Sequence, residues 1–226
     1  MPRLSSGIKP PAGSSVTLAS LFSLVVVCAA QDASLHKVEK AFNDANIPAN
    51  LNIAFQPSML LDVTFPQEYG HPIALHAGIQ VPVNDTVGPP TFSLQGQRRT
   101  ARHDNGPFVV AMVDPDAPTP QDPSVSQIRH FLGGNFYLGR DGCSLFNTTP
   151  AITEYVQPAP PSYSDAHRYV LLVYKQPKTF AQQDLVNASS SILSFNISQF
   201  ASAVELGSPL AGTFMLVSQN FTRVKN

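Results

Sequence analysis

The chain of 226 residues is poor in cysteine, since only Cys28 and Cys143 occur. If the first thirty residues are removed during export, Cys143 remains alone and cannot form an internal disulfide. The domain must then be held together by its apolar core. We expect Cys143 to be a buried thiol, with pairing to another molecule as the alternative.

The sequence also lacks an apolar run of the roughly 20 residues that a membrane-spanning helix needs. The apolar run at 16–30 has fifteen residues, follows a segment that carries Arg3 and Lys9 but no acid, and ends in small residues. This pattern is typical of a secretory signal peptide. We predict a signal at 1–30, cleavage after Ala30 and a single domain at 31–226. The protein is then secreted or kept in the secretory pathway, in the vacuole or cell wall; an uncleaved membrane anchor is the alternative.

Charged residues are scarce, at 13% of the chain. Loss of Arg3 and Lys9 leaves twelve bases against fifteen acids, a formal charge of −3. No polybasic run follows the signal, which argues against nucleic acid as a partner and against strong attraction to an anionic membrane. No HExxH motif, cysteine cluster or GxSxG motif is present either, which argues against the common zinc and serine hydrolases.

Five sequons without a central proline are present, more than the chance expectation of about two for this composition. They favour a glycosylated eukaryotic secretory protein. Their asparagines are Asn84, Asn147, Asn187, Asn196 and Asn220.

Helical spacing of apolar residues appears near the start of the mature chain and near its end. The first helix is expected after Asp32 or Ser34 as N-cap and is expected to end at Pro48; the second is expected at 195–206, capped by Asn196 or Ser198. Between them, period-two patterns and short apolar runs predict strands at 51–55, 60–65, 74–81, 91–96, 108–114, 128–138, 167–176 and 212–221.

Several of these runs, such as FVVAMV and YVLLVY, are apolar at both parities, so both faces of those strands should be covered. We predict a mainly β fold in which a central antiparallel sheet packs against a smaller sheet, with flanking N- and C-terminal helices.

Three polar groups stand at the ends of these apolar strands. Asp114 closes one strand on the face of Met112, and His167 opens another on the face of Tyr169. His130, near the start of a third, is expected on the face of Leu132 and Gly134. If antiparallel neighbours bring these ends together, the result is a rim with an apolar floor, which is the usual make-up of a small-molecule site.

Two long motifs carry a family resemblance: DPDAPTPQDPSVSQIRHFLGGN at 114–135 and HRYVLLVYKQP at 167–177. They resemble the two signatures of the phosphatidylethanolamine-binding proteins, and the likeness extends from about Pro48 to Val217. The segments NLNIAFQPSMLLDVTF and SPLAGTFMLVS are similar to the secreted fungal branch, of the carboxypeptidase Y inhibitor type.

The resemblance implies a shallow, non-enzymatic pocket that binds a phospholipid headgroup or another small anion, without a cofactor or metal. It implies that Arg168 is structural and that the Ala117–Pro118 bond is a candidate cis peptide. One departure is that Gln157, Tyr163 and Asp165 stand where family members usually carry glycines, so the mouth of the pocket should be narrower. The implied ligand-binding residues are Asp114, Asp116, Pro118, His130, His167 and Tyr169.

Three alternatives remain open. The first is inhibition of a serine carboxypeptidase or another peptidase through surface contacts, which the resemblance to the carboxypeptidase Y inhibitor type implies. The second is a metallohydrolase in which two aspartates and two histidines hold a metal. The third is that the DPDAP segment is only a stiff turn and that both histidines are hydrogen-bonded core residues.

Overall fold

The computed structural model describes residues 32–96 and 105–221. The predicted signal peptide and its cleavage after Ala30 lie outside the described residues and remain predictions. Within the described part, no helix is long and apolar enough to cross a membrane.

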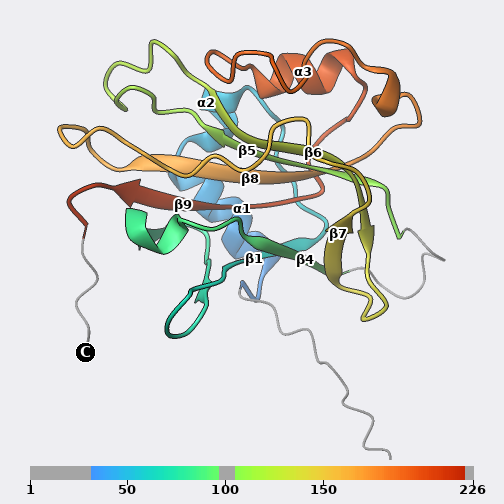
Figure 1. The fold of residues 1–226 in the computed structure, drawn as a ribbon, viewed down its shortest axis with the longest axis horizontal. Helices are drawn as coiled ribbons and strands as arrows, with labels where there is room; N and C mark the ends of the chain where they lie inside the picture. The colour runs from blue at the N-terminus through green and yellow to red at the C-terminus, as the bar shows by residue number, and fades with distance from the viewer. Residues whose placement is uncertain (1–31, 97–104, 222–226) are drawn as a thin grey trace, which may run out of the picture.

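One nine-stranded sheet forms the centre of the described structure, in the order β2-β1-β4-β7-β6-β5-β8-β9-β3 (Figure 1). Every neighbouring pair is antiparallel except β3 and β9, which run parallel. The strands are β1 (Leu60–Phe65), β2 (Ile73–Ala74), β3 (Ile79–Pro82), β4 (Thr91–Gln95), β5 (Phe108–Asp114), β6 (Ile128–Leu138), β7 (Ser144–Asn147), β8 (His167–Lys175) and β9 (Ala211–Ser218).

The sheet curls, so that β1 contacts β9 although five strands separate them in the ladder. The curl encloses an apolar cluster, which we call the inner core, with contributions from β1, β4, β5, β8 and β9. Val110 and Met112 of β5 and Leu171 of β8 lie in it. The predicted mainly β fold is confirmed, and the smaller layer is the curled end of one continuous ladder.

Helices cover the opposite face of the central strands, where a second apolar cluster forms the outer core. The helices are α1 (Leu35–Asp44), α2 (Ile47–Leu51) and α3 (Ile197–Ala203), with 3-10 turns η1 (Val83–Thr86) and η2 (Phe180–Gln182). Figure 1 shows α3 above the sheet. The outer core contains Val109, Ala111 and Val113, so alternate residues of β5 enter the two cores and the strand is covered on both faces, as its sequence predicts.

Side chains at the N-caps define where two of the helices begin. The Ser34 hydroxyl accepts a hydrogen bond from Lys37 N at the start of α1, and the side-chain oxygen Oδ1 of Asn196 accepts one from Gln199 N at the start of α3. Both caps were among the predicted ones. Pro48, however, does not end the first helix: α1 ends at Asp44, and Pro48 lies in the first turn of α2, where its missing N–H costs nothing.

Two predicted strands differ from the structure, and one observed strand was not predicted. The expected strand at 51–55 is wrong, because Leu51 ends α2 and no strand follows before β1. The expected strand at 74–81 is divided into β2 and β3. The short strand β7, which joins β4 to β6, was not predicted.

Cys143, just before β7, is buried and disulfide-bonded rather than free. The prediction of a buried free thiol is therefore wrong. It assumed that Cys28 leaves with the first thirty residues, and Cys28 lies outside the described residues.

Candidate functional site

The end of β5 meets the starts of β6 and β8, because both strands run antiparallel to β5. Asp114, the last residue of β5, pairs with Ile128, the first residue of β6. Val113 pairs with Val170, so that Asp114 lies near the beginning of β8. The predicted convergence of three strand ends at one rim is thus present in the structure.

Asp114 and His167 form a buried pair in this rim. The Nδ1 atom of His167 lies 2.8 Å from Oδ2 of Asp114, and each side chain is 2% exposed. The other carboxylate oxygen, Oδ1, accepts a hydrogen bond of 2.8 Å from the backbone N–H of Asp116. Since both oxygens are engaged, the carboxylate has a fixed orientation and holds the imidazole with its Nδ1–H toward Asp114.

Ser164 completes the surroundings of His167, with its Oγ 2.9 Å from Nε2 of the imidazole. The order Ser164–His167–Asp114 has the connectivity of a hydrolase triad. Ser164, however, is buried, whereas a nucleophile must reach its substrate. In this structure its hydroxyl serves to satisfy a histidine nitrogen that would otherwise be unpaired. Sequence reasoning missed Ser164, and its only signal was its position three residues before His167.

His130 reaches the same rim by a route that strand alternation did not predict. The pairing of β5 with β6 shifts between Met112↔Phe131 and Val113↔Arg129, so that His130 is an extra residue, a β-bulge. The expectation that His130 shares a face with Leu132 and Gly134 is wrong for this reason. Leu132 lies in the outer core, whereas the His130 ring packs edge-on against Tyr169 of the inner core, with centroids 5.0 Å apart.

The tautomer of His130 follows from its one hydrogen bond. Nδ1 lies 2.8 Å from the Val156 carbonyl oxygen, and a carbonyl only accepts, so Nδ1 carries a proton. Nε2 is fully buried and has no hydrogen-bond partner among the described residues. Burial lowers the pKa of His130, which keeps the ring neutral and leaves a lone pair on Nε2.

Tyr169 lies between the two histidines, stacked on His167 at a centroid distance of 6.3 Å and an interplanar angle of 20°. Burial raises the pKa of the Tyr169 phenol, and the nearby charge of Asp114 acts in the same direction. The phenol therefore keeps its proton. We call Asp114, His130, His167 and Tyr169 the rim cluster.

Asp116, in contrast, is bound on the helix side of the sheet. Its carboxylate accepts hydrogen bonds from Arg168 N, Nε and Nη2 at 2.7, 2.9 and 2.5 Å. Arg168 Nη1 in turn donates to the Ala45 carbonyl and to Asn50 Oδ1. The pair thus fastens the turn after β5 to α1 and α2, and both carboxylate oxygens of Asp116 are bound by Arg168.

The remaining predicted positions lie in the loops around the rim. Pro118 is half-buried and follows a cis peptide bond, as predicted. At the positions where family members usually carry glycines, Gln157 donates to the Val83 carbonyl at 3.0 Å, and Asp165 accepts from Gln121 at 2.6 Å. Tyr163 is 79% exposed. Each of the two polar side chains therefore joins its loop to another segment.

The described residues contain no group of three or more histidine, cysteine, aspartate or glutamate side chains placed to hold a metal ion. In the rim cluster, the oxygens of Asp114 already accept hydrogen bonds from His167 and from a backbone amide. What the cluster offers a ligand is instead the free nitrogen of His130 beside a phenol and a second imidazole.

Two proteins of known name are related to this chain in sequence. The chain is 33% identical over 148 residues to the carboxypeptidase Y inhibitor of Saccharomyces cerevisiae, an alignment that covers 55% of this chain and 66% of the relative. It is 36% identical over 107 residues to CEN-like protein 4 of Nicotiana tabacum, over 47% of this chain and 56% of the relative. The chain thus matches less than two thirds of the length of either relative.

Solved structures support the same assignment. A carboxypeptidase Y inhibitor complexed with its cognate proteinase superposes with a TM-score of 0.69 at 26% identity, over 82% of this chain and 97% of that one. A phosphatidylethanolamine-binding protein from Plasmodium vivax, with a TM-score of 0.64 at 12% identity over 80% and 97% of the two chains, shares the fold. The family model of the phosphatidylethanolamine-binding proteins matches residues 54–215. This chain therefore belongs to the phosphatidylethanolamine-binding protein family.

Proposed function

We propose that this protein binds a phospholipid headgroup, or a similar small anion, in the rim cluster and does not catalyse a reaction on it. The observation that carries the proposal is Nε2 of His130, a buried nitrogen without a partner among the described residues. A buried polar atom without a partner is costly, and a ligand that hydrogen-bonds to it removes that cost.

The protonation state of His130 determines what such a ligand must carry. A neutral ring with its proton on Nδ1 presents only a lone pair at Nε2, so one proton must lie between this nitrogen and the ligand. A phosphomonoester provides that proton when it is singly ionised, and a doubly ionised phosphate requires an imidazolium instead. In both cases the complex contains one proton more than a free neutral His130 ring and a free phosphate dianion together.

The other members of the rim cluster fit a ligand with charges of both signs. The Tyr169 phenol keeps its proton, and it donates to a phosphate oxygen in exchange for its hydrogen bond to Asp114. The Asp114 carboxylate repels a bare phosphate but attracts an ammonium group, such as that of ethanolamine. We assign positioning roles to Asp116 and Pro118, since the Asp116 oxygens are bound to Arg168 and Pro118 belongs to the turn.

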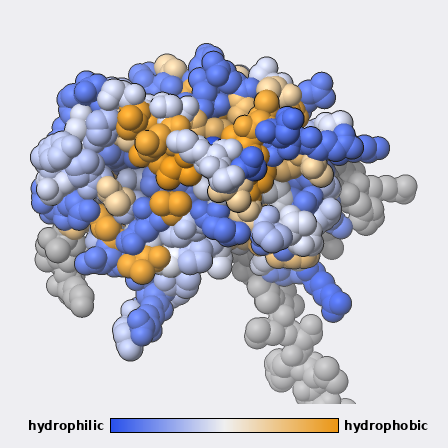
Figure 2. All heavy atoms as spheres, turned by 45° about the horizontal axis from the view of Figure 1, so that its top comes forward, coloured by the Kyte–Doolittle hydropathy of each residue, from blue (hydrophilic) through white to orange (hydrophobic). Residues whose placement is uncertain are grey.

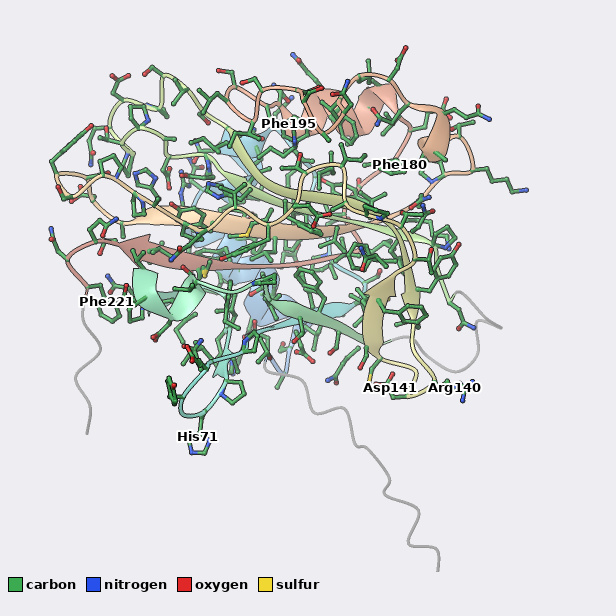
Figure 3. The ribbon with its side chains drawn as sticks, in the orientation of Figure 1. His71, Arg140, Asp141, Phe180, Phe195 and Phe221 are labelled. Atoms are coloured by element: carbon green, nitrogen blue, oxygen red, sulfur yellow. The ribbon has the colours of Figure 1, made fainter. Side chains whose placement is uncertain are left out.

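Calorimetric titration with phosphoethanolamine at pH 6 tests this proposal. The chain offers a matched control in His71, an exposed histidine on the loop between β1 and β2, on the side of the molecule opposite α3 (Figure 3). We expect His130→Ala to weaken binding about tenfold or more, from the loss of one charge-assisted hydrogen bond of about 1.5–3 kcal/mol. His71→Ala should leave binding unchanged. Equal affinities of the wild type and His130→Ala would remove the rim cluster as the binding site.

A second candidate is inhibition of a serine carboxypeptidase. It is favoured by the 33% identity to the yeast inhibitor and by the likeness to an inhibitor that was solved with its proteinase. Steady-state hydrolysis by carboxypeptidase Y in the presence of the purified protein measures it directly. Stoichiometric inhibition that persists in His130→Ala would place this activity on surface segments outside the rim cluster. Undiminished hydrolysis at a molar excess of the protein would argue against a peptidase of this type as partner.

We also propose that the protein passes through the secretory pathway and carries N-linked glycans. All five sequon asparagines are exposed, and the oxidising secretory lumen permits the disulfide at Cys143. Intact masses before and after enzymatic deglycosylation count the glycans. The intact mass measured without reductant also tests cleavage after Ala30. This cleavage removes Cys28, so the mass should show Cys143 paired only with another molecule.

A further inference from the structure

Arg129 is a buried cation on the helix side of the sheet, opposite the rim cluster. It is 1% exposed, and its guanidinium carbon lies 4.9 Å from the centre of the Phe195 ring. Figure 3 shows Phe195 on the side of the sheet that carries α3. Burial lowers the pKa of Arg129, which reflects the cost of keeping its charge away from water.

No carboxylate among the described residues lies within ion-pair distance of this guanidinium. Nε donates to the Thr153 hydroxyl at 2.6 Å, and Nη2 donates to the Ser190 carbonyl at 3.3 Å. These acceptors are neutral, and Nη1 makes no hydrogen bond within the described residues. Buried arginines are normally paired with an anion, so the Arg129 charge is left uncompensated.

A cavity of about 430 Å³ opens beside Arg129, a size typical of sites for small organic molecules. Arg129 is the only charged residue that lines it. The other lining residues combine apolar side chains with uncharged polar ones: Leu185, Val186, Leu193, Phe195, Phe200 and Ala203, with Ser190, Ser191, Ser194, Asn196 and Gln199.

The walls of this cavity include apolar side chains that reach the surface. Leu185 is 54% exposed and Leu193 is 49% exposed. Figure 2, in which the α3 side is turned forward, shows apolar side chains gathered among hydrophilic ones on this face. A ligand that covers these leucines would remove apolar surface from water, at about 25 cal/mol per Å².

We propose that this cavity, the Arg129 groove, binds a small carboxylate with an apolar tail. The carboxylate would accept from Nη1 and Nη2 of the guanidinium, whose planar fork matches its two oxygens. The tail would lie against the leucines and phenylalanines of the walls. A neutral amphiphile lacks the first interaction, and a small inorganic anion lacks the second, so a ligand needs both parts to bind well.

Octanoate is a suitable probe, with its neutral methyl ester as the matched ligand. A ligand that binds the folded state raises the unfolding temperature in proportion to the logarithm of its concentration. We expect octanoate to raise the unfolding temperature measured by circular dichroism and the ester to bind about tenfold more weakly or not at all. An ester as effective as the acid would overturn the proposal, because the guanidinium would then have no part in binding.

Gln199→Glu tests the site without removing the buried arginine. Gln199 lines the groove in the first turn of α3, where an acidic side chain suits the helix N-terminus, so the variant should fold at least as stably as the wild type. The new carboxylate would pair with the guanidinium of Arg129 or repel the carboxylate of octanoate. Octanoate should therefore bind about tenfold more weakly. Gln80→Glu, the same change on the exposed edge strand β3, should leave octanoate binding unchanged.

The His130→Ala variant separates this inference from the proposed function. Octanoate binding in this variant should equal that of the wild type, since the two sites lie on opposite faces of the sheet. Wild-type affinity for octanoate in Gln199→Glu would overturn the Arg129 groove as the binding site. Loss of octanoate binding in His130→Ala would do the same and would place the carboxylate in the rim cluster.

Discussion

Replacing Arg168 with methionine should destabilise the protein by about 3 kcal/mol. The variant tests whether the ion pair between Arg168 and Asp116 holds the turn after β5. The Asp116 side chain is 3% exposed and loses two of its three donors in the variant, keeping only the backbone N–H of residue 168. Removing one partner of a buried ion pair costs about 3–5 kcal/mol. Arg168 is 18% exposed, and one donor remains, so we place the loss at the lower end of this range.

The free energy of unfolding is measured by urea denaturation at pH 7, followed by far-ultraviolet circular dichroism. The double variant Arg168→Met/Asp116→Asn should be more stable than Arg168→Met by about 1 kcal/mol or more, because it no longer contains the buried, unpaired carboxylate of Asp116. Lys178→Met, at an exposed position, serves as the control and should change stability by less than about 0.5 kcal/mol. A loss below about 1 kcal/mol in Arg168→Met, or strictly additive losses in the double variant, would refute the role assigned to this pair.

Three further changes have defined outcomes. Affinity for phosphoethanolamine should fall by up to tenfold per pH unit as the pH rises from 7 to 8. Burial lowers the pKa of His130 and the second pKa of the phosphate is about 6, so in this range neither group carries the proton that the complex needs. Calorimetry should find this pH dependence absent in His130→Ala. Ser164→Ala should lower the free energy of unfolding in urea by about 1–2 kcal/mol, because it leaves Nε2 of His167 buried without a partner. Gly134→Ala should cost about 1–3 kcal/mol in the same assay, because a Cβ atom there would collide with an aromatic ring, whereas Gly88→Ala, with open space around it, should be nearly neutral.

Most of the central strands could be predicted from sequence because local signals bound them. The strands β5 and β6 begin and end at the predicted residues, and β8 differs only at its last residue. The apolar runs of β5 and β8 are bounded by proline or change to polar residues, and β6 ends before Gly139. Strand β7 has only four residues and no such pattern, and it forms because β4 and β6 leave a place between them. Its formation depends on pairing with the preceding β6 and with the distant β4, which the four residues of β7 do not themselves indicate.

The wrong strand at 51–55 shows how a period of two arises without a sheet. Leu51 and Phe55 are buried and Ile53 is half-buried, so the alternation reports real contacts with the core. Those contacts are made with the outer core under α1; for example, Phe55 stacks on Phe42 at 3.9 Å between ring centres. No neighbouring strand pairs with this segment in the described structure, and hydrogen bonding to a neighbour is what distinguishes a strand from an extended loop.

The bulge in β6 explains why strand alternation alone could predict only part of the candidate site. Alternation correctly places Asp114, His167 and Tyr169 on one face, because the pairing of β5 with β8 is regular. A regular pairing of β5 with β6 would set His130 opposite Val113, on the helix side. The one-residue shift instead sets Arg129 opposite Val113 and turns His130 toward Tyr169.

The same shift therefore decides the chemistry on both faces of the sheet. Without it, the guanidinium of Arg129 would enter the rim beside Tyr169, and the imidazole of His130 would lie under α3. With it, the titratable ring joins the acid and the phenol of the rim cluster, and the permanent cation enters a groove without acids. Since β-bulges re-aim side chains at the cost of a locally disrupted ladder, an extra residue at this point is more readily explained by the two sites than by stability of the sheet.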